Sequence, residues 1–307
     1  MSIEAQDFGR VAVLMGGWAA EREVSLVSGQ AVLDGLLRRG VDAHGIDADP
    51  QVLSVLADGR YDRVFNVLHG RGGEDGVIQG GLDVLGLPYT GSGVLGSALG
   101  MDKYRSKLLF RSLGLPTPPF ELIRSTADLA RVEALGFPLM IKPALEGSSI
   151  GMSRVENADE LHAAWLKAAE YDRHVMAEAW VEGAEYTAAV LGERALPLIR
   201  LETPHAFYDY DAKYVADDTR YLIPCGLDAA REAELQGLAL AAFEAIGASG
   251  WGRVDILMDR AQRPYLIEVN TVPGMTGHSL VPMAAQAVGL SFDDLVWSIL
   301  AQTLETD

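Results

Sequence analysis

The feature that most constrains this chain is the alternation of short apolar runs with helical patterns over its first third. Expected strands at 11–15, 41–46 and 63–68 alternate with segments whose apolar residues recur at helical spacing. Such alternation with short connections predicts a parallel sheet covered by helices, with the ligand site at the carboxyl ends of the strands. Glycine-rich turns follow the first and third runs, at that edge of the sheet. The beginning of the chain therefore predicts an α/β domain, which we end near residue 97.

The pattern changes after a helical stretch at 94–113 and the prolines that follow it. A short run at 87–90 predicts one more strand before that stretch. The runs beyond it are longer and antiparallel in character, and they lie at 139–142, 152–155, 175–181, 186–191, 196–201, 253–258 and 265–269. Helices are expected at 228–248 and twice near the C-terminus. Residues 202–224 show little periodicity, and long loops of this kind often serve as lids. This part predicts a hairpin-rich α+β region.

Charge and cysteine content exclude several classes of protein. The chain has 25 Lys and Arg against 43 Asp and Glu, a net charge of −18, so no basic field attracts nucleic acid or an anionic membrane. The single cysteine, Cys225, cannot form an internal disulfide, which is typical of a reducing compartment. The first ten residues do not resemble a signal peptide, and no apolar run reaches about 18 residues. We expect a cytoplasmic protein that binds neither nucleic acid nor membrane.

The strongest chemical signal lies between Arg253 and Asn270. Asp255 lies in one expected strand, and Glu268 and Asn270 lie two residues apart in the next, so both project from the same face. Two carboxylates and an amide oxygen suit Mg²⁺, a hard cation that proteins usually hold together with substrate phosphates. A hairpin with solvated acids is the alternative. Apolar neighbours in both strands disfavour it, because a buried acid needs a partner.

Other candidates lie at the ends of strands and helices. Lys142 ends an apolar strand, and the loop 146–151 after it supplies glycines and hydroxyls, as in a flap over phosphates. A plain hairpin loop with a surface lysine is the alternative, and Lys103 at a helix start could equally be solvated. His69 begins a glycine-rich loop after the third strand, although a lone histidine is usually structural. Glu21 opens the first helix, where capping alone favours acids.

Residues 91–96 match the pattern G-x-G-x-x-G that binds dinucleotide pyrophosphates. The match comes late in the first unit, and no acid lies about 20 residues further on at a strand end. A turn at the domain junction is therefore favoured over a nicotinamide cofactor site. The phosphate loop G-x-x-x-x-G-K-[ST] and the kinase signatures are absent from the sequence.

In order, these motifs resemble the D-alanine–D-alanine ligases of the ATP-grasp superfamily over almost the entire chain. The resemblance rests on the segments GGWAAEREVSLVSG, NVLHGRGGEDGVIQG, PYTGSG, SALGMDK, KPALEGSSIGMS, EAWVEGAEYT, FYDYDAKY, GWGRVDILMD and EVNTVPGMTGHSLVPMAA. It implies an α/β and α+β architecture: an N-terminal parallel α/β domain (1–97), then a two-lobed ATP-grasp fold. The central lobe would be 98–184, and the C-terminal lobe would be 185–307 with the lid loop 202–224. ATP would lie between the antiparallel sheets of the two lobes.

The resemblance also implies roles for single residues at the nucleotide. The implied positions are, for the phosphates, Lys103, Lys142 and Lys213; for the adenine, Glu178, Ala179, Trp180 and Val181; and for the ribose, Glu185. Two Mg²⁺ ions, for which Mn²⁺ could substitute, would be held by Asp255, Glu268 and Asn270. The departures from the family pattern are Ala179, where relatives often have lysine, Val272 and Gly277.

At the amino acid substrates, the resemblance implies a binding site for two D-alanine molecules. Glu21 would bind the first ammonium group, and the second carboxylate would meet Ser279 and Leu280. His69 would lie near the acyl transfer, and the oxyanion would be stabilised by Arg253 and the Gly274 N–H. The set that ties the domains together on closure would be Glu21, Ser148 and Tyr214.

The implied reaction has two steps and serves peptidoglycan precursor synthesis. A D-alanine carboxylate attacks the γ-phosphate of ATP to give an acyl phosphate, and the amine of a second D-alanine then displaces phosphate. Tyr214 favours a dipeptide product, because related depsipeptide-forming ligases have phenylalanine there. A homodimer is expected by family analogy. The alternative, a nucleotide-binding protein that has lost catalysis, is disfavoured because the implied metal ligands are intact.

Overall fold

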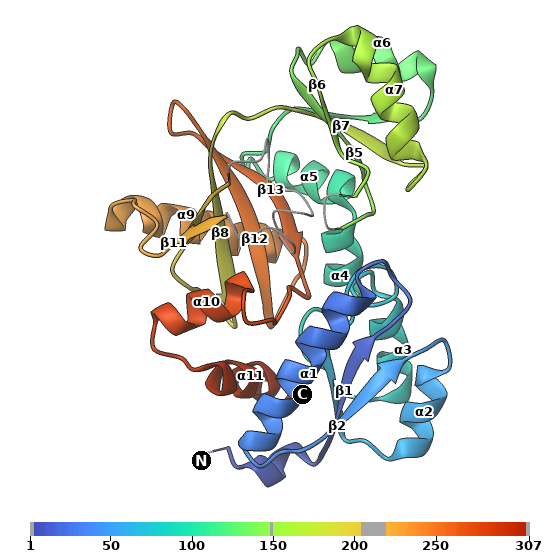
Figure 1. The fold of residues 1–307 in the computed structure, drawn as a ribbon, viewed down its shortest axis with the longest axis vertical. Helices are drawn as coiled ribbons and strands as arrows, with labels where there is room; N and C mark the ends of the chain where they lie inside the picture. Colours follow the sequence, from blue (N-terminus) through green and yellow to red (C-terminus); the bar gives the residue numbers. More distant parts are fainter. Residues whose placement is uncertain (1–2, 148–149, 204–218, 305–307) are drawn as a thin grey trace.

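The computed structural model describes residues 3–147, 150–203 and 219–304. Within them the strands form three separate sheets (Figure 1). The first sheet is parallel with the order β2-β1-β3, and its strands are β1 (Arg10–Gly16), β2 (Asp42–Ala48) and β3 (Arg63–Asn66). Its helices are α1 (Arg22–Arg38), α2 (Val52–Gly59) and α3 (Val77–Leu85). A short 3-10 helix, η1 (Ala5–Phe8), precedes β1.

The central strand β1 is buried on both faces of this sheet. Val11 and Val13 pack with α1, while Ala12 and Leu14 pack with α2 and α3, because successive strand side chains point to opposite faces. A strand covered on both sides must be apolar throughout, which explains the uninterrupted aliphatic run in the sequence. The predicted parallel α/β unit is confirmed.

The second sheet is antiparallel with the order β4-β7-β5-β6. Its elements are β4 (Phe120–Ile123), η2 (Thr126–Asp128), α6 (Leu129–Glu133), β5 (Leu139–Pro143), β6 (Ser153–Val155), α7 (Ala158–Ala169) and β7 (Val175–Ala179). One face of the sheet packs against α6 and α7. Lys142 and Glu178 alternate with the residues of that packed face, so they point to the other side.

The third sheet is antiparallel with the order β11-β10-β8-β12-β13. Its strands are β8 (Gly183–Leu191), β9 (Arg194–Ala195) beside it, β10 (Ile199–Glu202), β11 (Arg220–Leu222), β12 (Trp251–Asp259) and β13 (Pro264–Asn270). One face packs against α5 (Lys103–Ser112) and α9 (Ala229–Ala245). The architecture is therefore a parallel α/β unit followed by two lobes built on antiparallel sheets, as predicted.

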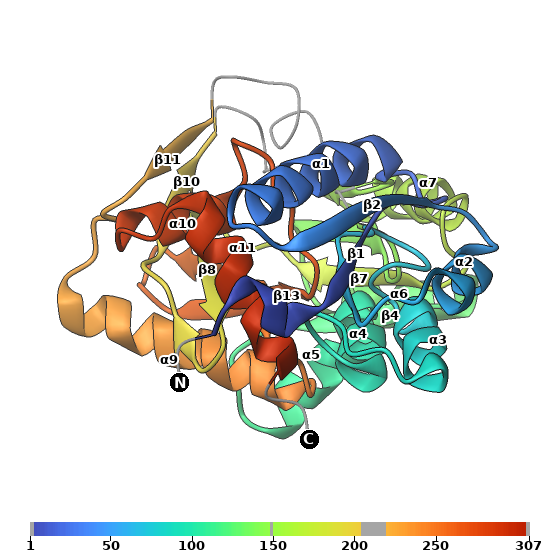
Figure 2. The same ribbon diagram turned by 90° about the horizontal axis from the view of Figure 1, so that it is seen from below.

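The C-terminal helices join the third sheet to the N-terminal unit. α10 (Leu280–Ala287) and α11 (Phe292–Ala301) share one core with α1, β1 and residues of β8 and β12, and the short η3 (Gln302–Leu304) ends the described chain. Figures 1 and 2 both show α11 beside α1, although the two helices are far apart in sequence. α10 packs on β8 of the third sheet and α11 packs on α1, so the C-terminal helices connect the two units. Of the proposed boundaries, 97 falls inside α4 (Val94–Met101) and 184 falls inside β8.

Several local predictions need correction. The helical stretch at 94–113 is two helices, α4 and α5, because Asp102 leaves helical geometry and its carboxylate caps α5 by accepting from the Arg105 amide at 2.9 Å. The expected strand at 87–90 is a single bridge between Tyr89 and Val64. The expected strand at 196–201 begins only at Ile199, and β4 was not predicted.

The predicted lid segment 202–224 begins in one strand of the third sheet, β10, and contains another, β11, near its end. Glu202 in β10 pairs with Arg220 in β11, so both ends of the segment continue the third sheet. Its central residues, 204–218, lie outside the described residues. No helix in the described ranges has the length and apolar character needed to cross a membrane.

The glycine motif at 91–96 has a packing role. Gly93 caps the start of α4, and Gly91 has a φ of +90°, where a side chain would be strained. A Cβ atom on Gly96 would lie 2.4 Å from the carbonyl oxygen of Gly247, in the turn after α9. Only glycine lets these two backbones approach so closely.

We expect Gly96→Ala to lower the free energy of unfolding by about 1–3 kcal/mol, because the carbonyl it meets belongs to a backbone that cannot retreat. Urea denaturation measures the change. Gly237→Ala is the matched control: it also lies inside a helix, and no atom of the described chain beyond that helix lies within 4 Å of its added Cβ. The control is expected to gain up to about 1 kcal/mol. Equal effects of the two substitutions would contradict the prediction.

Candidate active site

A cavity of about 480 Å³ lies between the sheets of the two lobes. Apolar side chains form part of its walls, with Met140 from β5 on one side and Leu257 and Ile267 from β12 and β13 on the other. The cavity also brings together, from the sequence-predicted positions, Lys103, Lys142, Glu178, Ala179, Trp180, Val181, Glu185, Asp255 and Glu268. Lys213 lies outside the described residues.

A smaller cavity of about 80 Å³ adjoins the first. The sequence-predicted residues that line it are Glu21, His69, Arg253, Glu268, Asn270, Gly274, Ser279 and Leu280. Glu268 and Gly147 line both cavities, so the two spaces meet at these residues. Ser148 and Tyr214 lie outside the described residues. The structure thus divides the predicted positions into a large cavity between the lobes and a small one beside the N-terminal unit.

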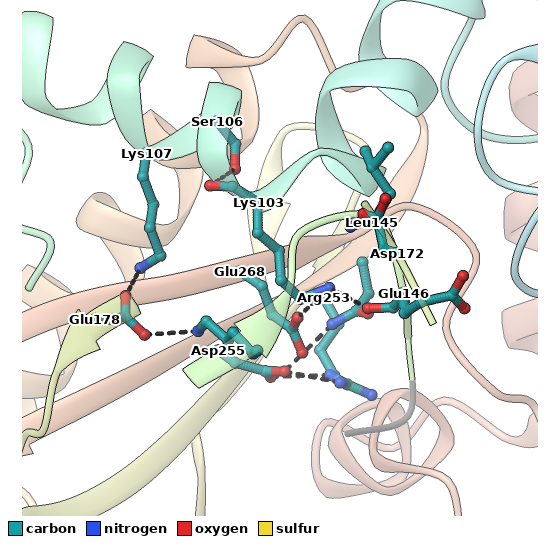
Figure 3. Close-up of polar contacts among 12 residues, drawn as sticks. Lys103, Ser106, Lys107, Leu145, Glu146, Asp172, Glu178, Arg253, Asp255 and Glu268 are labelled. Carbon is teal, nitrogen blue, oxygen red and sulfur yellow. Dashed lines mark hydrogen bonds and ion pairs between the residues drawn. The ribbon is translucent and has the colours of Figure 1, made fainter. Parts of the chain in front are cut away.

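The predicted metal ligands gather where β12 pairs with β13. Asp255 lies opposite Glu268 in the register, and a bulge follows directly after Asp255. The Arg253 guanidinium donates to both carboxylate oxygens of Asp255, with Nε to Oδ1 at 2.9 Å and Nη2 to Oδ2 at 2.7 Å (Figure 3). Thr187 donates to Oδ1 at 2.7 Å, and Asn270 Nδ2 lies 3.2 Å from Oδ2. Adjacent strands therefore converge their polar groups on one corner of the cavity.

The oxygen atoms gathered at this corner are of the kind that bind a hard cation. The described residues contain no group of three or more His, Cys, Asp and Glu side chains suited to a metal ion. The set here combines two carboxylates with the amide of Asn270, and Mg²⁺ commonly completes such a set with water and phosphate oxygens. Lys103 Nζ lies 3.1 Å from Glu268 Oε2. Burial alone would lower the pKa of Lys103, but the Glu268 carboxylate raises it above its ordinary value, so the lysine is charged.

Lysine side chains surround the acids on the central-lobe side. Lys103 Nζ also donates to the Glu146 carbonyl oxygen at 2.7 Å, which ties α5 to the loop after β5. Lys142 Nζ lies 2.6 Å from Glu178 Oε2, and Lys107 contacts the other oxygen of Glu178. Sequence reasoning missed Lys107. The available signal was its position four residues after Lys103, on the same face of one helix.

The Glu21 carboxylate lies between two glycines from different loops. A Cβ atom on Gly70 would lie 2.5 Å from Glu21 Oε2, and one on Gly147 would lie 2.7 Å from Oε1. Glu21 is the residue before α1, Gly70 follows β3, and Gly147 follows β5. The absence of side chains at both glycines lets a carboxylate from the N-terminal unit reach the loop of the central lobe.

Neutral groups line the same small cavity. His69 Nδ1 donates to the Val272 carbonyl oxygen at 2.9 Å, while Nε2 is buried without a hydrogen-bond partner among the described residues. Burial lowers the pKa of His69 to about 4, so the ring is neutral and Nε2 is an acceptor. Glu74, which sequence reasoning noted only as an acid of the loop, also lines this cavity. Burial, aided by the charge of Glu21, raises the pKa of Glu74 to about 8.

The far end of the small cavity is the start of a helix. Ser279 is the residue before α10, and Leu280 is its first residue. Ser279 Oγ accepts from the Thr276 amide at 2.9 Å, and a Cβ atom on Gly274 would lie 2.9 Å from that oxygen. The free N–H groups and the dipole of a helix N-terminus favour a carboxylate at this place.

Comparisons with known proteins agree over nearly the whole chain. A family model described as "D-ala D-ala ligase C-terminus" matches residues 109–301, and one described as "D-ala D-ala ligase N-terminus" matches residues 54–92. The D-alanine–D-alanine ligase of Methylococcus capsulatus is 62% identical over 298 residues, which cover 97% of this chain and 96% of that relative. The ligase of Nitrosococcus oceani is 59% identical over 304 residues, with 99% and 96% covered.

Solved structures give the same result. The D-alanine–D-alanine ligase from Bacillus anthracis complexed with ATP matches with a TM-score of 0.84 at 30% identity, covering 96% of this chain and 97% of that one. The VanG D-Ala:D-Ser ligase from Enterococcus faecalis matches with a TM-score of 0.84 at 31% identity, covering 96% and 99%. The backbone is thus shared by ligases whose names differ in the second amino acid.

Glu74→Gln tests whether the Glu74 carboxyl group is protonated in the small cavity. Since the pKa of Glu74 is about 8 in the folded chain against 4.5 ordinarily, the unfolded chain binds fewer protons between these values. The contribution of Glu74 to stability therefore falls as the pH rises through this range. Gln does not titrate, so the variant should gain stability relative to wild type from about pH 5 to about pH 8. Urea unfolding at several pH values measures the difference; parallel pH profiles would refute the assignment.

Proposed function

Because the chain belongs to the D-alanine–D-alanine ligase family, we propose that its two adjoining cavities form one reaction site, with ATP in the larger and D-alanine in the smaller. The protein is an ATP-dependent ligase that joins two D-alanine molecules through a D-alanyl phosphate intermediate and releases ADP and phosphate. Its product is D-alanyl-D-alanine, a peptidoglycan precursor. The observation that supports this placement best is that Glu268 and Gly147 line both cavities.

In this proposal the large cavity holds the nucleotide. Lys103 and Lys142 bind the phosphates, together with Lys213, because ammonium groups in a confined site attract anionic oxygens strongly. The segment 178–181 lies along the adenine, and Glu185 binds the ribose. The apolar walls beside these polar groups suit a flat aromatic base.

The metal assignment is also a proposal. Asp255, Glu268 and Asn270 would hold two Mg²⁺ ions, for which Mn²⁺ could substitute, and these ions would neutralise charge on the phosphoryl group as it moves. Lys103 and Arg253 lie against the same carboxylates, so these side chains keep the acids paired and oriented. The Lys103 ammonium group and the Arg253 guanidinium group also place positive charge where the phosphate and the oxyanion must lie.

The small cavity would take the amino acids. Its volume of about 80 Å³ suits a side chain as small as a methyl group. Glu21 binds the ammonium group of the first D-alanine, and the second carboxylate lies at Ser279 and Leu280. Arg253 and the Gly274 N–H stabilise the oxyanion, with His69 beside them.

Closure of this site would depend on three residues from separate segments. Ser148 and Tyr214 would join Glu21 in a hydrogen-bonded set that excludes water, which would otherwise hydrolyse the acyl phosphate. Gly147, the residue before Ser148 in the sequence, lies against the Glu21 carboxylate, and this supports the proposed contact between Glu21 and Ser148. Further parts of the proposal are a cytoplasmic homodimer without nucleic acid or membrane partners; the charge of −18 supports the absence of nucleic acid.

Phosphate release tests the proposed reaction and its specificity. The purified protein is given ATP and Mg²⁺ with D-alanine, L-alanine, D-alanine plus D-serine, or D-alanine plus D-lactate, and the products are identified by mass. We expect release that depends on D-alanine, with D-alanyl-D-alanine as the product. A mixed dipeptide or depsipeptide as the main product would overturn the specificity assignment. Absence of release with every acceptor would favour a nucleotide-binding protein without ligase activity.

Glu268→Gln tests the metal corner. Removal of this charge should reduce turnover by about a thousandfold or more, because charge stabilisation at a transferring phosphoryl group contributes several kcal/mol. Glu182→Gln is the control, since Glu182 lines the same cavity at an exposed position and pairs with Arg260. Turnover and the Mg²⁺ concentration for half-maximal activity are measured for both. Wild-type turnover in Glu268→Gln would show that the metal ligands lie elsewhere.

A further inference from the structure

Lys107 is a buried cation that the proposed reaction does not use. Its side chain is 0% exposed, and within the described residues it does not line either cavity. It lies on α5, and its side chain reaches Glu178 of β7 (Figure 3). A buried lysine is costly unless it is paired, so its partners indicate what it does.

Three partners from three segments satisfy the Lys107 ammonium group. It forms an ion pair with Glu178 of β7. It donates to the hydroxyl oxygen of Thr117 at 2.9 Å and to the carbonyl oxygen of Leu266 in β13 at 3.0 Å. The Thr117 hydroxyl itself lies 2.9 Å from the same carbonyl oxygen. Lys107 therefore joins a strand of the central lobe to a strand of the C-terminal lobe, behind the cavity.

Glu178 is shared between this buried lysine and a lysine of the cavity. Lys142 Nζ lies 2.6 Å from its second oxygen, and both Glu178 and Lys142 line the large cavity. Burial would raise the pKa of Glu178, but the two lysines together hold it below its usual value, so the carboxylate is charged. One carboxylate against two ammonium groups leaves one positive charge at this place. If Glu178 had only Lys142 as a partner, the pair would be neutral and the cavity would lose that charge.

We propose that Lys107 is a positioning residue that neutralises Glu178 from behind, so that the charge of Lys142 remains available to a phosphate of ATP. This inference rests on the proposed function, in which Lys142 binds phosphate. Without Lys107, the Glu178 carboxylate holds Lys142 as its only counter-ion and competes with the nucleotide. If Lys107 only held the two lobes together, removing Glu178 as well would not restore the charge of Lys142 to the nucleotide.

Lys107→Met tests whether loss of the buried charge weakens ATP binding, since methionine keeps the apolar stem and removes the charge. We expect the KM for ATP to rise by about tenfold, the size of one charge-assisted hydrogen bond. The KM for D-alanine should change less than twofold, because the small cavity is not altered. Lys167→Met is the matched control: Lys167 lies on α7 outside both cavities, 3.3 Å from Ser153 Oγ, and its loss should leave both constants unchanged. Equal changes in both KM values for Lys107→Met would contradict the inference.

The double variant Lys107→Met/Glu178→Gln separates charge balance from bracing. It removes the carboxylate together with its buried partner, so Lys142 has no competitor and no unpaired acid is buried. Glu178→Gln alone is its reference, because Glu178 itself lines the nucleotide cavity. We expect the two KM values for ATP to agree within about threefold, because Lys107 has no carboxylate left to neutralise once Glu178 is glutamine. A KM that Lys107→Met raises about tenfold in the Glu178→Gln background as well would identify a structural brace and overturn the inference.

Lys142→Met distinguishes failure of this inference from failure of the proposed function. A raised KM for ATP in Lys142→Met with an unchanged KM in Lys107→Met refutes only the role of Lys107. An unchanged KM in Lys142→Met means that this lysine does not bind the nucleotide, and the proposed phosphate site fails with the inference. Thermal melting of each variant without ligands shows whether a change in KM accompanies loss of the fold.

Discussion

The pairing of β12 with β13 is the interaction on which the candidate site depends. It places Asp255 opposite Glu268, and the bulge after Asp255 ends the regular alternation just there. β12 also pairs with β8, and this pairing places Thr187 of β8 beside the Asp255 carboxylate. A shift of one residue in this register would send the acids to the opposite face, against α9. The site therefore requires the apolar core that holds the register.

A second constraint is the balance of buried charge. Asp255 pairs with Arg253, Glu268 with Lys103, and Glu178 with Lys107 and Lys142. Each acid is thus matched by a cation before any ligand arrives, which lowers the cost of burying it. These cations come from β12, α5 and β5, so the electrostatics of the cavity depend on both lobes being in place.

Much of the fold could be predicted because local signals agreed with tertiary structure. The aliphatic run at 11–15 is apolar because both faces of β1 are covered, and the pattern shows this directly. The division of the stretch at 94–113 was harder to see, since both halves have helical spacing and only the cap at Asp102 separates them. Strands β4 and β11 were not predicted because they are short, and pairing with β7 and β10 is what makes them strands.

The sequence by itself determined the parallel α/β beginning and the two antiparallel lobes, and strand alternation placed Glu268 and Asn270 on one face. The tertiary structure alone decided which charges meet. Nothing in the spacing shows that Lys107 reaches Glu178, that Arg253 binds Asp255 bidentately, or that Glu21 lies between Gly70 and Gly147. These contacts join segments that are distant in sequence or depend on side-chain direction, and packing of the lobes is what brings them together.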